Sequence, residues 1–220
     1  MKCLHALSFV PVVLAVLATP ALGQDAQAPA VGPKWYLVGV GGAAFNQDFD
    51  NPTTVVGGEF GERVHRDVYA YVGLTYLDNL MSQQMRDYLD QASGSFGASF
   101  TGRDRGLAFT LGAKYMLPTS ARIRPYFGGG FGLLNLERTI SDPLLGDVTR
   151  IFPAMSGLND GVVPSGENAT TNPLGELIVG VGGAFNRRGY FDIKYRYGHA
   201  FQSSENVDFS QISAAIGVTF

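Results

Sequence analysis

The stretch from Gln211 to Phe220 reads Gln-Ile-Ser-Ala-Ala-Ile-Gly-Val-Thr-Phe, and it alternates strictly between two kinds of side chain. Apolar residues occupy every even position, and small or polar residues occupy the odd positions between them. A period of two is typical of a β-strand whose two faces meet different surroundings. The stretch therefore predicts a strand, and the fold depends on which environment each face meets.

The same alternation recurs upstream. Between Phe191 and Tyr197, for example, aromatic and apolar residues alternate with Asp192, Lys194 and Arg196. We expect about eight strands of roughly 9–13 residues, near the length that crosses a bilayer at a tilt. Besides those two, the expected strands are 68–76, 107–117 and 177–185, and the glycine-rich, less regular segments 35–45, 55–64 and 124–137.

Long and short connections alternate between these strands. The longest are 77–102 and 139–173, whereas 65–67 and 186–189 are tight. Short turns at one end and long loops at the other are typical of outer-membrane barrels. The sequence therefore predicts an eight-stranded antiparallel up-and-down transmembrane β-barrel over residues 35–220.

Composition excludes several other classes. Only 16% of the 220 residues are charged, against about 25% in soluble domains, and there are 29 glycines and one cysteine. These values do not fit a disordered chain, a coiled coil or a disulfide scaffold. With 16 Lys and Arg against 19 Asp and Glu, no basic surface for nucleic acid is expected.

The first residues have the pattern of a secretory signal peptide. Lys2 precedes an apolar run, and Ala21-Leu22-Gly23 places small residues before a cleavage point. We expect residues 1–23 to be the signal peptide and 24–34 a flexible leader. Cys3 precedes the apolar run, so it is not the cysteine that a lipoprotein carries after its signal.

The direction of the two faces decides between two kinds of barrel. A soluble lipocalin-like barrel that binds a ligand would enclose its apolar face. Here the charged face is sparse and rich in small residues, and aromatic residues lie near strand ends, as in membrane girdles. We therefore expect the apolar face to meet lipid and the charges to pair inside as a structural network, with a small diffusion channel as the alternative. The expected lumen residues are Glu59, Arg63, Lys114, Glu176, Asp192, Lys194 and Arg196.

Three segments resemble a known family. Arg124-Pro-Tyr-Phe-Gly-Gly-Gly-Phe-Gly132 and Lys194-Tyr-Arg-Tyr-Gly198 are similar to strands of the small OmpA/OmpX-like outer-membrane β-barrel domain family. The strand ending at Phe220 resembles the signal by which such barrels are recognised for assembly. The resemblance implies a bacterial outer-membrane location, contact with lipid and lipopolysaccharide, and the barrel assembly machinery as a partner. Because no further domain is expected after the last strand, it does not imply peptidoglycan anchoring.

An enzymatic alternative depends on His199. It lies near Ser203, Ser204 and Glu205, and lipid A deacylases of the PagL type use a histidine, a serine and an acid at a similar place. Those enzymes place serine two residues after histidine, where this chain has Phe201. We therefore expect no enzymatic activity, and the sequence predicts no cofactor and no metal site.

The long connections carry the expected surface role. Residues 77–92 place Leu80, Met81, Met85 and Leu89 at helical spacing, with Asp78 as a candidate N-cap. The segment 139–173 is also unusually apolar for a loop. We expect 77–102 and 139–173 to offer a contact surface for a partner, in a protein with a structural and surface-interaction role.

Overall fold

The computed structural model describes residues 33–45, 52–81, 83–97, 99–119, 121–144, 146–148, 169–186, 188–201 and 207–220. The expected signal peptide and most of the expected leader lie outside the described residues.

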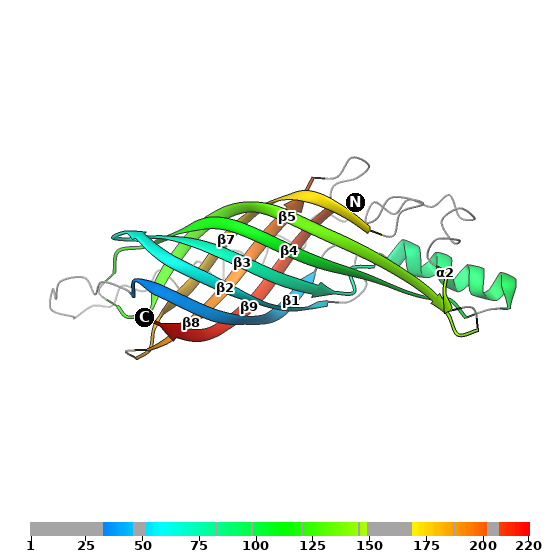
Figure 1. Cartoon of the computed structure of the whole chain (residues 1–220), viewed down its shortest axis with the longest axis horizontal. Helices are drawn as coiled ribbons and strands as arrows, with labels where there is room; N and C mark the ends of the chain where they lie inside the picture. The colour runs from blue at the N-terminus through cyan, green and yellow to red at the C-terminus, as the bar shows by residue number, and fades with distance from the viewer. Residues whose placement is uncertain are drawn as a thin grey trace, which may run out of the picture.

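The described chain forms a closed antiparallel barrel of eight long strands (Figure 1). Each strand pairs with its neighbours in the chain, β1 pairs with β9, and pairing of β4 with β5 completes the ring. The eight-stranded barrel predicted from the sequence is therefore confirmed. The long strands are β1 (Trp35–Phe45), β2 (Thr53–His65), β3 (Val68–Asp78), β4 (Thr101–Met116), β5 (Arg124–Asp142), β7 (Ala169–Ala184), β8 (Gly189–Ala200) and β9 (Val207–Thr219). The two remaining elements are helix α2 (Gln83–Phe96) and the short strand β6 (Gly146–Asp147) beside β5.

The register of the strands fixes the shape of the barrel. A path that starts at His199 of β8 and steps from each residue to its partner on the next strand goes once around the ring. It returns to β8 at Gly189, ten residues from its start. Such a stagger requires strands that tilt by roughly 35–45° from the barrel axis. At the seam, main-chain hydrogen bonds of 3.1 and 3.2 Å join Trp35 and Phe220 in both directions.

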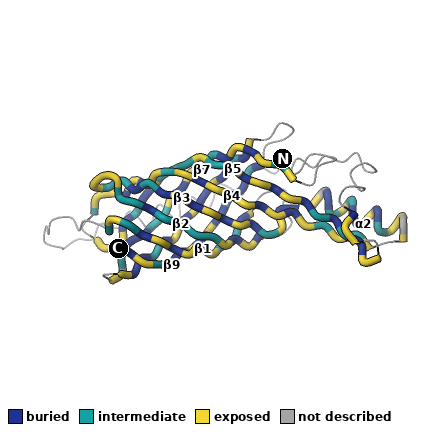
Figure 2. Tube along the Cα trace, viewed as in Figure 1, coloured by how far each residue is buried: buried dark blue, intermediate teal, exposed yellow. Residues whose placement is uncertain are grey.

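The two faces of the strands point as the sequence predicts. Ile212 and Ile216 are 54% and 68% exposed on the outside, whereas Asp192, Lys194 and Arg196 are buried inside. Figure 2 shows this alternation of exposed and buried residues along the strands. Neighbouring strands pair around the closed ring, which is how β-structure satisfies its backbone groups in lipid. A soluble barrel, with its apolar face enclosed, is therefore the wrong alternative.

The two ends of the barrel differ. At the end that we call the turn end, tight connections join β2 to β3 and β7 to β8, and Phe220 lies there (Figure 1). At the opposite loop end, β4 and β5 run past the other strands toward α2 (Figure 1). We call the loop-end parts of these two strands, residues 101–105 of β4 and 137–142 of β5, together with α2 and β6, the arm.

Helix α2 covers one side of the arm. Met85, Leu89 and Ala92 of the helix pack with Met81 and with Ile140 of β5 in a buried cluster. The helix was predicted, but its start was not. Asp78 is the last residue of β3 and lies outside α2, so the expectation that it caps the helix is wrong. Among the described residues, no helix combines the length and apolar character that a membrane span requires.

Candidate functional site

The centre of the lumen is an ion-pair network around Glu59 of β2. This carboxylate accepts hydrogen bonds from Lys114 of β4, from Lys194 of β8 at 2.6 Å, and from the hydroxyl of Tyr36 at 2.7 Å. Lys114 also donates to Asp192 Oδ2 at 2.9 Å. All four charged side chains are at most 2% exposed. Burial of so many charges is tolerated because each has an opposite charge within hydrogen-bond distance.

A second group lies beside the first, nearer the loop end. Arg196 Nε is 3.3 Å from Glu176 Oε2, and Arg196 Nη1 donates to the hydroxyl of Thr75 at 3.4 Å. The hydroxyl of Tyr71 donates to the other oxygen of Glu176. Because the Tyr71 ring also lies 5.3 Å from Lys114 Nζ, Tyr71 connects the two groups. Six of the seven residues expected in the lumen are thus brought together across β2, β4, β7 and β8.

The seventh residue, Arg63, lies apart from these six. It is on the inward face of β2 but near the turn end, where it is half-buried and pairs across strands with Tyr69. Strand alternation alone assigned it to the lumen, and its place near the end of β2 separates it from the network.

A layer of inward tyrosines surrounds the network and was not predicted from the sequence. The layer consists of Tyr36, Tyr69, Tyr71, Tyr126 and Tyr190, all at most 4% exposed. Tyr36 and Tyr190 stack with ring centroids 4.7 Å apart, and Tyr126 donates to Asp192 at 2.6 Å. The alternation along β3 could have predicted this layer, because Tyr69 and Tyr71 lie on the opposite face of the strand from the outward-facing Val72.

Glycines on the inner face make room for these rings. A methyl group added at Gly61 would overlap the Tyr36 ring, and one added at Gly180 would overlap the Tyr126 ring. The glycine content that blurred the strand pattern is therefore explained in part by tyrosine packing.

The lumen is filled toward the loop end by apolar side chains, which we call the loop-end plug. Its larger members are Leu77, Leu80, Leu134, Leu136 and Phe209, each at most 3% exposed. The plug was also missed, because Leu133 and Leu134 are adjacent and sequence alone does not show which one points inward. In the structure Leu133 is half-exposed on the outside and Leu134 is fully buried.

At the turn end, Arg124 bridges the short connections. Its Nη2 donates to Asp67 Oδ1 at 2.5 Å and to the carbonyl of Met116 at 3.0 Å, and its Nε donates to the carbonyl of Leu117 at 3.0 Å. These contacts tie the β2–β3 turn to the β4–β5 connection.

His199 lies on the outer face of the barrel at the loop end. Its Nδ1 is 2.5 Å from Asp208 Oδ1, and its ring meets Phe201 edge-on with centroids 4.4 Å apart. Asp208 was not predicted as the partner of this histidine. Ser203, Ser204 and Glu205, which the enzymatic alternative requires, lie outside the described residues.

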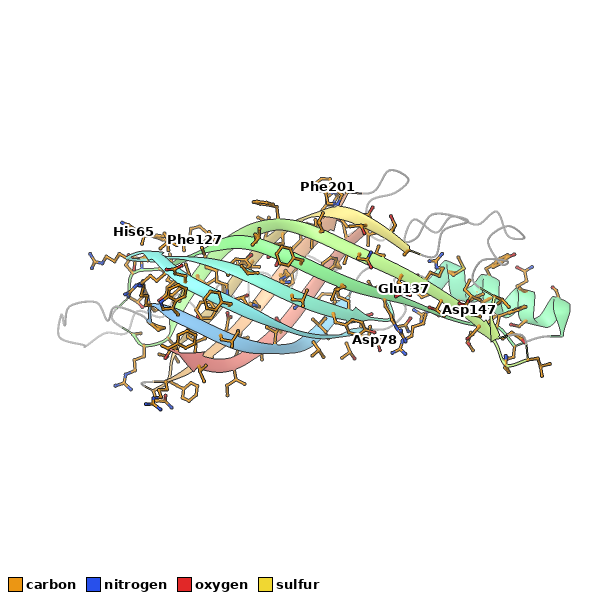
Figure 3. The ribbon with its side chains drawn as sticks, viewed as in Figure 1. His65, Asp78, Phe127, Glu137, Asp147 and Phe201 are labelled. Carbon is orange, nitrogen blue, oxygen red and sulfur yellow. The ribbon has the colours of Figure 1, made fainter. Side chains whose placement is uncertain are left out.

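An exposed ion pair marks the base of the arm on the outside. Arg103 donates to both oxygens of Asp78, with Nε to Oδ1 at 2.9 Å. These hydrogen bonds hold the pKa of Asp78 below its ordinary value. Figure 3 shows Asp78 and Glu137 toward the loop end, with His65 at the opposite end.

Charge is distributed unevenly between the two ends. Among the described residues, basic side chains exceed acidic ones at the turn end, and acidic side chains exceed basic ones at the loop end. The turn end carries Lys34, Arg63, Arg66, Arg122, Arg124 and Arg188 against Glu62 and Asp67. The loop end carries Asp78, Asp87, Asp90, Asp104, Glu137, Asp142, Asp147 and Asp208 against Arg86, Arg103, Arg105 and Arg138. In the described part of the chain, no cluster of three or more His, Cys, Asp or Glu side chains is arranged to hold a metal ion.

Comparison with known families decides the identity of this barrel. A family model described as the outer membrane protein beta-barrel domain matches residues 12–220. The chain belongs to this outer membrane β-barrel domain family. The protein is accordingly located in the bacterial outer membrane, as the outward apolar faces require.

Solved structures share the fold of this outer membrane barrel at low sequence identity. Neisserial surface protein A is 18% identical with a TM-score of 0.52, over 85% of this chain and 97% of that chain. The N-terminal barrel domain of Pseudomonas aeruginosa OprF is 10% identical with a TM-score of 0.51, over 86% and 99%. The attachment invasion locus protein Ail of Yersinia pestis is 9% identical with a TM-score of 0.50, over 86% and 99%. A comparison with curated protein sequences finds no match.

Proposed function

We propose that this outer membrane barrel is a non-catalytic structural and recognition protein, in which a sealed barrel anchors an ordered arm at the cell surface. The observation that carries the proposal is the contrast between a filled lumen and an arm with its own buried cluster. The first feature serves anchoring rather than transport, and the second holds a surface in one conformation.

The filled lumen argues against the diffusion-channel alternative. The ion-pair network with its surrounding tyrosine layer fills the centre of the lumen, and the loop-end plug fills the lumen toward the loop end. In barrels of eight strands the interior is just wide enough for side chains to fill it. An ion would have to displace paired charges and apolar side chains in turn.

The arm carries the proposed recognition surface. Helix α2 buries Met85 and Leu89 against β5 and exposes Gln83, Asp87 and Asp90. Since acidic residues predominate at the loop end, the surface suits a neutral or basic partner and disfavours polyanions. The names of two proteins with this fold, a surface protein and an attachment protein, agree with such a role.

The enzymatic alternative is not favoured by the outer rim. His199 has an acidic partner in Asp208, but a hydrolase also needs a nucleophile within reach of the histidine. The position two residues after His199 is Phe201, whose side chain supplies none. We therefore assign His199 and Asp208 no catalytic role.

Complementation of a deletion strain tests the proposal. The wild-type gene and a triple variant of the exposed helix face, Asp87→Lys, Asp90→Lys and Gln91→Lys, are expressed at equal levels. We expect both to restore resistance of the envelope to detergent, and only the wild type to restore adhesion to host-cell or abiotic surfaces. The unboiled gel mobility of both proteins verifies that the barrel is folded.

Two further measurements decide against the alternatives. We expect the deletion to leave the lipid A mass spectrum unchanged, and the purified protein to give no conductance steps in planar bilayers. A change in lipid A that wild type reverses would establish an enzyme, and reproducible conductance steps would establish a channel.

A further inference from the structure

The lipid-facing side of the β8–β9 hairpin ends in hydrogen-bonding side chains at the loop end. The hydroxyl of Tyr195 lies 2.8 Å from that of Ser210, Asp208 contacts His199 Nδ1 at 2.5 Å, and Tyr197 lies beside Asp208 on the same face. We call these five residues the outer polar row. They alternate with inward residues along each strand, so the row belongs to the outer face.

The surroundings of the row are apolar. Tyr197 pairs across strands with Leu177, which is 66% exposed, and Tyr195 pairs with Ile212, which is 54% exposed. Both neighbours face the acyl chains of lipids. Asp208 and His199 contact each other, but their side chains remain 48% and 27% exposed beside this apolar surface, where further polar partners lower the cost of a charged group. The headgroup layer is the nearest source of such partners.

Aromatic faces lie in the row and beside it. Phe201, which meets His199 edge-on, is 54% exposed and lies at the outer rim in Figure 3, and Tyr195 and Tyr197 of the row are each 37% exposed. Aromatic rings at a membrane interface offer an apolar body with a polar tip. Such rings can pack against the C–H face of a sugar, while a carboxylate and an imidazole bind its hydroxyl groups.

The charge of the row favours a sugar over a phosphate as the ligand. The row contains the acidic Asp208 and no lysine or arginine. A phosphate group would therefore meet a like charge, whereas a sugar hydroxyl would donate to the carboxylate. His199 contacts Asp208 through Nδ1, and its second ring nitrogen, Nε2, is the atom that we assign to a sugar hydroxyl.

We propose that the outer polar row binds the sugar headgroup of a glycolipid in the outer leaflet. Asp208 and His199 bind ring hydroxyls, and Phe201 with Tyr197 packs against the sugar ring. The site rests on the proposed orientation, with the loop end at the cell surface, and it is independent of the proposed role of the arm.

Native mass spectrometry of the purified full-length barrel in detergent tests the site. The probes are a neutral monoglucosyl diacylglycerol and phosphatidylglycerol with the same acyl chains. We expect the wild-type protein to retain the glucolipid at least tenfold more strongly. Asp208→Asn and, separately, Tyr197→Phe should lower that retention about tenfold and leave phosphatidylglycerol unchanged.

Asp78→Asn is the matched control, because it removes the same charge from an exposed ion pair at the same end of the barrel. It should leave glucolipid retention unchanged. The sugar site is overturned if the wild type prefers phosphatidylglycerol, or if both variants of the row retain the glucolipid as the wild type does. These assays use detergent, so their outcome does not depend on orientation in the cell, which is measured separately below.

Discussion

Arg138 pairs with Asp104 through two hydrogen bonds, Nε to Oδ1 at 2.9 Å and Nη2 to Oδ2 at 2.6 Å, and both side chains are buried. The two residues lie directly opposite each other on β5 and β4. Their paired charges face inward at the base of the arm, next to the loop-end plug. This pair therefore holds the two strands of the arm together, next to the barrel, without exposing a charge.

Removal of one partner should loosen the arm. In Asp104→Ala the buried guanidinium of Arg138 loses the carboxylate that accepts two of its hydrogen bonds, and removal of one member of a buried ion pair typically costs about 3–5 kcal/mol. We expect faster hydrogen exchange in α2 and in the outer ends of β4 and β5, with the membrane part of the barrel unchanged. Asp78→Ala, which breaks an exposed pair, is the control and should change exchange little. Equal exchange in both variants would show that the buried pair does not hold the arm.

Glu59 should be the most sensitive charge of the lumen. Glu59→Gln leaves Lys114 and Lys194 with one negative partner fewer, so we expect a loss of about 3–5 kcal/mol in the free energy of unfolding. Urea titration in lipid vesicles, followed by the unboiled gel mobility, measures this loss. Glu62→Gln, on the opposite face of β2, is the control. Unfolding at the same urea concentration for both variants would contradict a stabilising role of the network.

Gly61 should tolerate no side chain. A methyl group there overlaps the Tyr36 ring, which is held by Tyr190 and Glu59, so Gly61→Ala should destabilise the barrel by about 1–3 kcal/mol. Gly41→Ala is the comparison, because a methyl group at Gly41 has no atom within 4 Å. The same vesicle titration distinguishes them. A Gly61→Ala protein as stable as Gly41→Ala would mean that the tyrosine layer adapts without cost.

The orientation of the barrel can be measured on intact cells. Cys3 is the only cysteine of the chain, so single cysteines can be introduced with little background. We expect Asp90→Cys on α2 to react with a membrane-impermeant maleimide, and Arg66→Cys in the β2–β3 turn to react only after the cells are lysed. The reverse pattern would place the arm in the periplasm and remove the basis of its recognition role.

Asp78 should titrate at lower pH than an unpaired aspartate. The hydrogen bonds from Arg103 lower its pKa, so the ion pair contributes stability above the unfolded-state pKa of about 4 and loses it as pH falls through the lower folded value. The effect on total stability is small, since the pair is exposed. Carboxyl NMR of the purified barrel should show the Asp78 midpoint rise in Arg103→Gln and stay constant in Arg66→Gln. An unchanged midpoint in Arg103→Gln would exclude the ion pair in solution.

The barrel and its faces could be predicted because alternation is a local property. Asp192, Lys194 and Arg196 point inward as predicted, since a strand with one lipid face fixes every second residue. The strand ends in the arm were not predicted as strands, because the charged residues around Asp104 and Arg138 do not alternate with apolar ones as in the membrane. Their pairing depends on β4 meeting β5, which no local pattern reveals.

The seam between β1 and β9 has a consequence for folding kinetics. It pairs Tyr36 with Thr219, so the residues brought together there are separated by most of the described chain. Such long-range contacts raise the contact order, and their entropic cost is met before the pairing stabilises the ring. Until the seam forms, β1 and β9 each present an open edge within the lipid, where every unpaired amide is costly. Insertion of this barrel should therefore be slow and nearly all-or-none unless a catalyst shields those edges.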